Sequence, residues 1–167
     1  MGTKRVGLAR TQALIQNLKR ELTMGGATLT GQKQRFLLKT ANYTVVQADG
    51  GGVIQVKPAD TTLIQLPSAA TVGAGWSIDI IVNQDDGGTL DQKVNIGTAS
   101  GEFFNGIIIG GDAGGSLIAN GTSNDFITLT ASAKSGERFT IVSDGTRMHA
   151  TGWAYDVSHT AFANAAG

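Results

Sequence analysis

Short segments of alternating apolar and polar residues fill the chain from Arg35 onward, and this alternation constrains the fold more than any other feature. The segments read FLLKT, YTVVQ, VIQVK, TLIQL, WSIDIIV, KVNI, GIIIG, SLIA, FITLTA, RFTIV and MHATGW. A period of two in segments rich in β-branched and aromatic residues predicts half-buried β-strands. In residues 76–83 most of the apolar side chains fall on one face of the predicted strand, and the polar ones fall on the other.

Close spacing of the predicted strands without helices between them points to an antiparallel fold. We expect an antiparallel β-sandwich, a jelly roll or a small barrel. Parallel βαβ folds would require crossover helices, which the pattern from Arg35 onward lacks. The segments QDDGG, GGDAGG and SDGT contain residues that tolerate positive φ, so we expect them to form hairpin or loop tips.

Residues 4–23 have a different, helical period. Apolar residues spaced four and seven apart would form one stripe of an α-helix: Leu8, Leu14, Ile15, Leu18 and Leu22. Gly25 and Gly26 end this pattern. A helix of this length is marginal in water without tertiary contacts, so the stripe is expected to pack on its own β domain, a sister subunit or a larger partner.

The predicted organisation is one β domain with an N-terminal arm. A chain of 167 residues suits one domain and an appended segment. We predict a helical arm and connector at residues 1–34, a β-sandwich or jelly-roll domain at 35–157 and a C-terminal tail at 158–167. The fold class is therefore mainly β with an α-helical arm.

The zero net charge of the chain conceals an uneven distribution. Residues 1–39 hold eight basic residues and one acidic residue, a balance of +7, and the remainder has a balance of −7. Such a basic arm could dock on an acidic surface, on nucleic acid or on the acidic body of a neighbouring subunit, or its charges could simply be solvated. Nucleic-acid binding is not expected, because the basic residues lie in the arm and most aromatic residues lie in the acidic body.

No motif in the chain indicates an enzyme. Cysteine is absent, which excludes disulfides and thiolate metal sites and suits a reducing cytosol. Asp85-Asp86 lacks the spacing of a calcium loop, and the glycine run 110–115 lacks the lysine of a phosphate-binding loop. His149 and His159 have no neighbouring acid or serine in a recognisable arrangement. We expect no catalysis, cofactor or metal, and neither a signal peptide nor a membrane span.

Three segments resemble a β module of virion structural proteins of tailed bacteriophages. They read NYTVVQADGGGVIQV, TTLIQLPSAATVGAGWSIDIIVNQDDGG and RFTIVSDGTRMHATGW. The opening MGTKRVGLARTQALIQNLKREL is similar to the start of small virion proteins of marine phages, including those that infect cyanobacteria. The module occurs in tail fibres and spikes as well as on heads, so the resemblance indicates a virion component rather than its location.

The second of these segments contains a hinge with a physical interpretation of its own. Leu66 ends a strand and Pro67 stops its pairing. Gly73 and Gly75 let the backbone reverse before Trp76 enters the next strand.

Length favours the head over the tail. A small β domain with an arm resembles a capsid decoration (cement) protein, which implies a non-enzymatic homotrimer that binds the major capsid protein on the virion surface after assembly in the host cytoplasm. The residues expected to bind the capsid or sister subunits lie in the arm: Arg5, Leu8, Arg10, Leu14, Ile15, Leu18, Lys19, Arg20 and Leu22.

Two alternatives remain open from the sequence. The first is a tail fibre, spike or tail-tip adaptor that presents the loops at 110–115 and 120–124 to other tail proteins or to a host surface. The second is a spike that binds or cleaves a host glycan, which jelly rolls also support.

Overall fold

The computed structural model describes residues 11–13, 34–84, 88–112 and 115–164. The chain divides into two units, Met1–Lys33 and Gln34–Gly167. Within the first unit only residues 11–13 are described, and they are helical. The predicted helical arm at 1–34, with all the anchoring residues from Arg5 to Leu22, otherwise lies outside the described residues.

The second unit is mainly β, as the alternating pattern predicts. Its strands are β1 (Phe36–Lys39), β2 (Tyr43–Thr44), β3 (Val53–Val56), β4 (Thr62–Gln65), β5 (Ala74–Val82), β6 (Val94–Gly97), β7 (Phe104–Gly110), β8 (Ser116–Asn120), β9 (Phe126–Leu129), β10 (Arg138–Asp144), β11 (Met148–Ala154) and β12 (Thr160–Ala163). A 3₁₀ turn, η1 (Gln47–Asp49), and one helical turn, α2 (Ala69–Val72), lie between strands.

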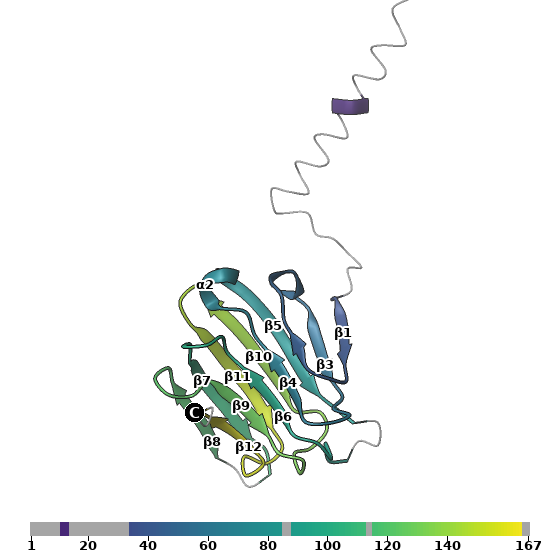
Figure 1. Cartoon of the computed structure of the whole chain (residues 1–167), viewed down its shortest axis with the longest axis vertical. Helices are drawn as coiled ribbons and strands as arrows, with labels where there is room; N and C mark the ends of the chain where they lie inside the picture. Colours follow the sequence, from purple (N-terminus) through teal and green to yellow (C-terminus); the bar gives the residue numbers. More distant parts are fainter. Residues whose placement is uncertain (1–10, 14–33, 85–87, 113–114, 165–167) are drawn as a thin grey trace, which may run out of the picture. The chain divides into compact units, whose positions relative to one another are not determined.

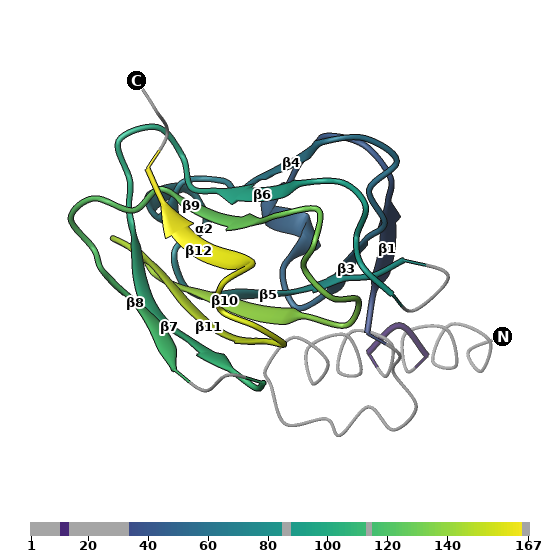
Figure 2. The same ribbon diagram turned by 90° about the horizontal axis from the view of Figure 1, so that it is seen from below.

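The strands form two sheets that lie as two layers (Figure 1, Figure 2). Sheet A has seven strands in the order β1-β3-β5-β10-β11-β7-β8, and sheet B has five in the order β12-β9-β6-β4-β2. The prediction of a mainly β, two-sheet domain is confirmed. Each segment that the sequence analysis named as a strand corresponds to one of β1–β11.

The first six strands alternate between the two sheets, and this overturns the expectation of purely antiparallel pairing. β1, β3 and β5 lie in sheet A, whereas β2, β4 and β6 lie in sheet B. Within each set the neighbours are parallel. The prediction was wrong because a chain that crosses to the opposite sheet and back returns in the same direction. Parallel pairs therefore form here without crossover helices.

The second half of the chain contains the antiparallel pairs. The GGDAGG and SDGT segments join β7 to β8 and β10 to β11 as hairpins, as predicted. β9 pairs antiparallel with both β6 and β12 in sheet B. β7 lies parallel to β11, so one parallel pair also occurs in this half of sheet A.

The core lies between the sheets. β5 shows the predicted alternation, with Trp76, Ile78, Ile80 and Val82 buried and the residues between them partly exposed. The largest fully buried side chains come from both layers: Ile54, Ile64, Leu66, Ile78, Ile80, Leu90, Ile96, Phe104, Ile108, Ile127, Leu129 and Phe139. Burial of each such side chain stabilises the fold by about 1.5–3 kcal/mol.

The predicted hinge crosses from sheet B to sheet A. Leu66 continues the β4 ladder by donating its N–H to Gly97 O, and Pro67 follows. Gly73 ends α2 with φ 78°, and Gly75 has φ 86°, conformations that favour glycine. Trp76 then enters β5 with its ring in the core, and its Nε1–H donates to Gln47 O at 3.0 Å.

The buried carboxylate of Asp49 stabilises the beginning of the β unit through hydrogen bonds and an ion pair. Asp49 is fully buried, and its Oδ2 accepts hydrogen bonds from the Tyr43 hydroxyl at 2.8 Å and from Val46 N at 3.0 Å. Its Oδ1 lies 2.9 Å from Arg35 Nη1, which donates to Ala48 O. The hydrogen bond to Asp49, aided by burial, raises the pKa of Tyr43. The chain is thus tied to the body immediately before β1.

The predicted C-terminal tail at 158–167 contains a strand, which is a correction. β12 pairs with β9 at the edge of sheet B, and Thr160 is buried. Its hydroxyl donates to Oε2 of the fully buried Glu137 at 2.7 Å, while Lys134 N donates to Oε1 at 3.3 Å. The short segment TAFA has little β-branched content, so its strand depends on these nonlocal contacts.

Glu137 gives the fold a pH dependence. Burial raises the pKa of Glu137 above its usual 4.5, although its hydrogen bonds act in the opposite direction. The folded chain therefore holds this proton to a higher pH than the unfolded chain does. The contribution of protonated Glu137 to the free energy of unfolding is present in full below the pKa that Glu137 has in the unfolded chain. It is lost as the pH rises through the higher pKa of Glu137 in the folded chain.

We predict that Glu137→Gln, which resembles the protonated side chain, removes this loss. Urea unfolding of both proteins between pH 4 and 7.5 measures it. The native chain should lose stability relative to the variant as pH rises. A stability difference that is constant across this range would contradict the assignment.

Candidate interaction surface

The outer face of sheet A exposes large apolar side chains at both of its edges. A two-layer protein of this size ordinarily keeps apolar side chains between its sheets, so clusters on an outer face indicate contact with another surface.

The first cluster lies at the β8 edge, and we name it the β7–β8 patch. It consists of Ile107 and Ile109 on β7, Ile118 on β8 and Trp153 on β11. Ile118 is 72% exposed and Ile109 is 53% exposed. The pairings Ile107↔Ile118 and Trp153↔Ile109 place these side chains next to one another on one face.

A glycine sets the position of β7 beneath this patch. A Cβ added at Gly106 would lie 1.8 Å from the backbone oxygen of Ala150 on β11. Only glycine allows the two parallel strands to approach this closely. Ile108 then points into the core while Ile107 and Ile109 point outward.

The second cluster lies at the opposite edge, and we name it the β1 patch. Phe36 is 57% exposed and Leu38 is 55% exposed, whereas Leu37 between them packs against the core. Figure 1 shows β1 and β8 at opposite edges of the same sheet.

The centre of the face carries an internally paired polar cluster on β5 and β10, although Val142 on β10 is also partly exposed there. Arg138 on β10 forms an ion pair with Asp79 on β5, and the Thr140 hydroxyl donates to the other oxygen of Asp79 at 2.5 Å. These contacts satisfy the carboxylate within the sheet. This polar cluster lies between the two apolar patches.

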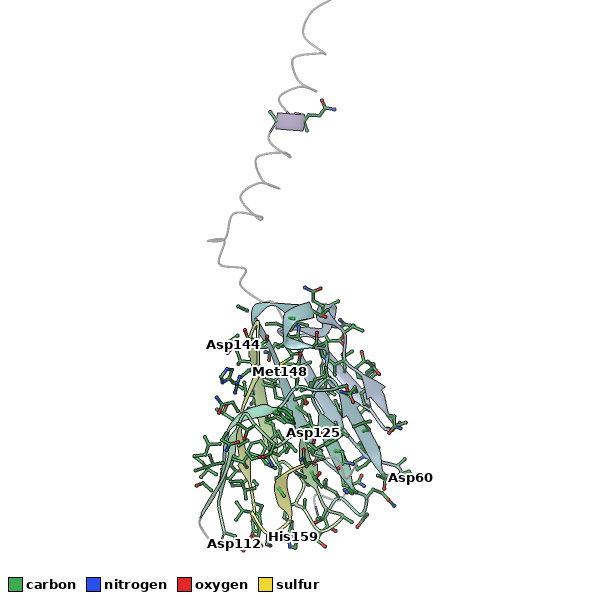
Figure 3. All side chains as sticks on the ribbon, turned by 60° about the vertical axis from the view of Figure 1, so that its left-hand side comes forward. Asp60, Asp112, Asp125, Asp144, Met148 and His159 are labelled. Atoms are coloured by element: carbon green, nitrogen blue, oxygen red, sulfur yellow. The ribbon has the colours of Figure 1, made fainter. Side chains whose placement is uncertain are left out.

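His149 has an acidic neighbour, contrary to the expectation from sequence. Its Nε2 lies 2.7 Å from Asp144 Oδ2, and Asp144 Oδ1 accepts from Thr146 N and Arg147 N at 2.7 Å each. The hydrogen bond to His149, with those from the hairpin backbone, lowers the pKa of Asp144 to about 2. Figure 3 shows Asp144 close to Met148 at one end of the β unit. The pair fastens the exposed β10–β11 hairpin.

The loops that a tail protein would present flank the β7–β8 patch. Residues 110–112 and 115 border β7 and β8 at one end, and 120–124 follow β8 at the other. Asn120 Oδ1 accepts from both N and Oγ1 of Thr122, which fixes the second loop. Separate depressions in the surface lie beside sheet B, one around Gln65, Thr98 and Phe126 and another around Asn42 and Thr61.

Among the described residues, no cluster of three or more His, Cys, Asp or Glu side chains could hold a metal ion. In the same part of the chain, no helix has the length and apolar character needed to span a membrane.

The hinge residues Leu66, Pro67, Gly73, Gly75 and Trp76 shape the fold and lie outside the apolar patches. The predicted anchoring residues of the arm fall outside the described residues. Sequence analysis missed the exposed isoleucines and Trp153, although one signal was present. GIIIG, SLIA and FLL are continuous apolar runs, which are typical of strands covered on both faces.

Comparisons with protein-family models, curated proteins and solved structures found no match to this chain.

We predict that Gly106→Ala destabilises the protein by about 1–3 kcal/mol, because the methyl group must push β7 away from the backbone of β11. Urea unfolding at pH 7 measures the change. Thr151→Ala, an exposed substitution on β11, serves as the control and should have little effect. Equal stability of Gly106→Ala and the native chain would contradict the close approach.

Proposed function

We propose that this chain is a non-enzymatic structural protein of a tailed-bacteriophage virion, and specifically a capsid decoration (cement) protein. It binds the major capsid protein as an oligomer, a homotrimer, and stabilises the head. The observation that carries the proposal of an assembling structural protein is the outer face of sheet A, which exposes two apolar patches on one side of a small, well-packed β unit. The resemblance of residues 42–56, 61–88 and 138–153 to a phage virion module supplies the biological context.

The stabilising mechanism is binding to the assembled state. A protein that contacts adjacent capsomers favours the assembled shell over its separated parts by mass action. A specific interface buries on the order of 1,000 Å² or more, and many copies on one head multiply the effect. The β unit provides the rigid surface that such contacts require, because its buried residues come from both sheets.

The arm provides the attachment to the shell in this proposal. Its apolar stripe, Leu8, Leu14, Ile15, Leu18 and Leu22, would bury against capsid protein or sister subunits. Four basic residues would set charge complementarity and register: Arg5, Arg10, Lys19 and Arg20. The arm would be linked firmly to the β unit, because Arg35, just after the arm, forms an ion pair with buried Asp49. Asp49 also accepts a hydrogen bond from Tyr43.

The second candidate is a tail component, such as a short fibre, spike or tail-tip adaptor. It is favoured by the two loops that flank the most exposed strand, β8, because loops beside an apolar surface are common binding sites. Binding of the purified protein to isolated tails or to host surface glycan, but not to heads, would favour this candidate.

We predict that deletion of residues 1–24 weakens binding to purified heads by about tenfold or more, equivalent to about 1.4 kcal/mol, because the anchoring stripe and its charges are removed. Co-sedimentation of the protein with heads measures the binding.

A full-length variant with Arg5, Arg10, Lys19 and Arg20 changed to Gln separates charge from apolar contact. Its binding should be intermediate and less dependent on salt. Circular dichroism of each variant verifies that the β unit is folded. Undiminished binding of the deleted chain would rule out the anchoring role.

A further inference from the structure

The edge strands of sheet A, β1 and β8, and the strand next to β8, β7, carry residues suited to burial on both faces. β1 contains FLL, β7 contains III and β8 contains LI, so apolar side chains point to both sides of each strand. The central strands β5 and β10 mix polar and apolar residues at their outer positions, which include Asp79 and Arg138 as well as Ile81 and Val142. Continuous apolar strands are typical of sheets covered on both sides. In the single chain, large apolar residues on the outer side of these three strands are exposed.

The two patches also match in register. Backbone pairing aligns Phe36 on β1 with Ile107 and Ile118 across the whole sheet, through Val53, Asp79, Thr140 and Thr151.

We call such a set of paired residues across the sheet a row. The next row whose side chains lie on the outer face runs from Leu38 to Trp153 and Ile109, through Gln55, Ile81 and Arg138. Each row therefore begins with a large apolar residue of the β1 patch and reaches the β7–β8 patch at the other edge.

This alignment fits a cyclic assembly. In a ring, every residue keeps its height along the symmetry axis from one copy to the next. If the axis runs parallel to the strands, a row in one copy meets the same row in its neighbour. Phe36 then meets Ile118, and Leu38 meets Ile109 and Trp153.

We propose that the β7–β8 patch of one copy packs against the β1 patch of the next copy and closes a ring of three. The ring size rests on the homotrimer of the proposed function, whereas the contact between the patches rests on the residues above. A two-fold pairing of either patch with itself would leave the other exposed in every copy. The ring covers both patches in all three copies.

The first test uses two variants whose changes lie at exposed positions. Phe36→Asp with Leu38→Asp disables the β1 patch, and Ile109→Asp with Ile118→Asp disables the β7–β8 patch. Ala161→Asp, on an exposed position of β12 in sheet B, is the matched control. Light scattering of the full chain measures the mass of each protein.

The native chain and the control should have three times the chain mass of 17.2 kDa, and each double variant should be monomeric. An equimolar mixture of the two double variants retains one intact patch on each partner. It should form a species of two chains and nothing larger. A monomeric native chain, a double variant that remains trimeric, or a mixture that stays monomeric would overturn the proposal.

Disulfide trapping tests the same contact without added charge. The chain has no cysteine, so only introduced cysteines can form a bond. The combination Leu38→Cys with Ile109→Cys should give covalent trimers on oxidation, whereas Ile109→Cys alone should not crosslink. Dimers formed by Ile109→Cys alone would indicate like-to-like pairing and contradict the ring.

These outcomes are separate from those of the proposed function. A trimer that does not bind heads would leave the contact standing and remove the capsid role. A monomer that binds heads would retain the capsid role but remove both the contact and the homotrimer of the proposed function.

Discussion

The alternation of the first six strands between two sheets is the constraint on which the rest of the structure depends. Each crossing places one apolar face in the space between the layers, so the core is built from both sheets at once. Alternation also sets the parallel direction of β1, β3 and β5 and of β2, β4 and β6. Hydrogen bonds stabilise the segments that cross between the sheets. Trp76 Nε1–H donates to Gln47 O in η1, and the Glu102 carboxylate accepts from Ala69 N at the start of α2.

The later hairpins widen sheet A beyond sheet B and create its asymmetric outer face. β10–β11 and β7–β8 both join sheet A, whereas β9 and β12 complete sheet B. The centre of its outer face holds a polar cluster in which Arg138 and Thr140 satisfy the carboxylate of Asp79. Its edges are apolar and open to solvent. The fold thus concentrates unburied apolar surface at the two edges of one face, which is where an assembling protein needs it.

Sequence patterns predicted β1–β11 and the hinge because alternation, proline and glycine act locally. They did not predict pairing, because the direction of β3 relative to β1 depends on where the intervening strand lies. β12 was missed because Thr160 becomes a strand residue through its contact with buried Glu137. The exposed patches were missed because GIIIG indicates two covered faces but cannot say whether the second cover belongs to the same chain.

The proposed decoration role combines a rigid β unit, an edge-to-edge contact between copies and a basic arm directed at the shell. Its central claim is that this protein occupies the outside of the head. The most direct measurement is a reconstruction of the virions that contain it, at a resolution that distinguishes the two-sheet body. The account predicts three copies of this body around three-fold positions of the head surface. Density for the same body on the tail, with none on the head, would contradict it.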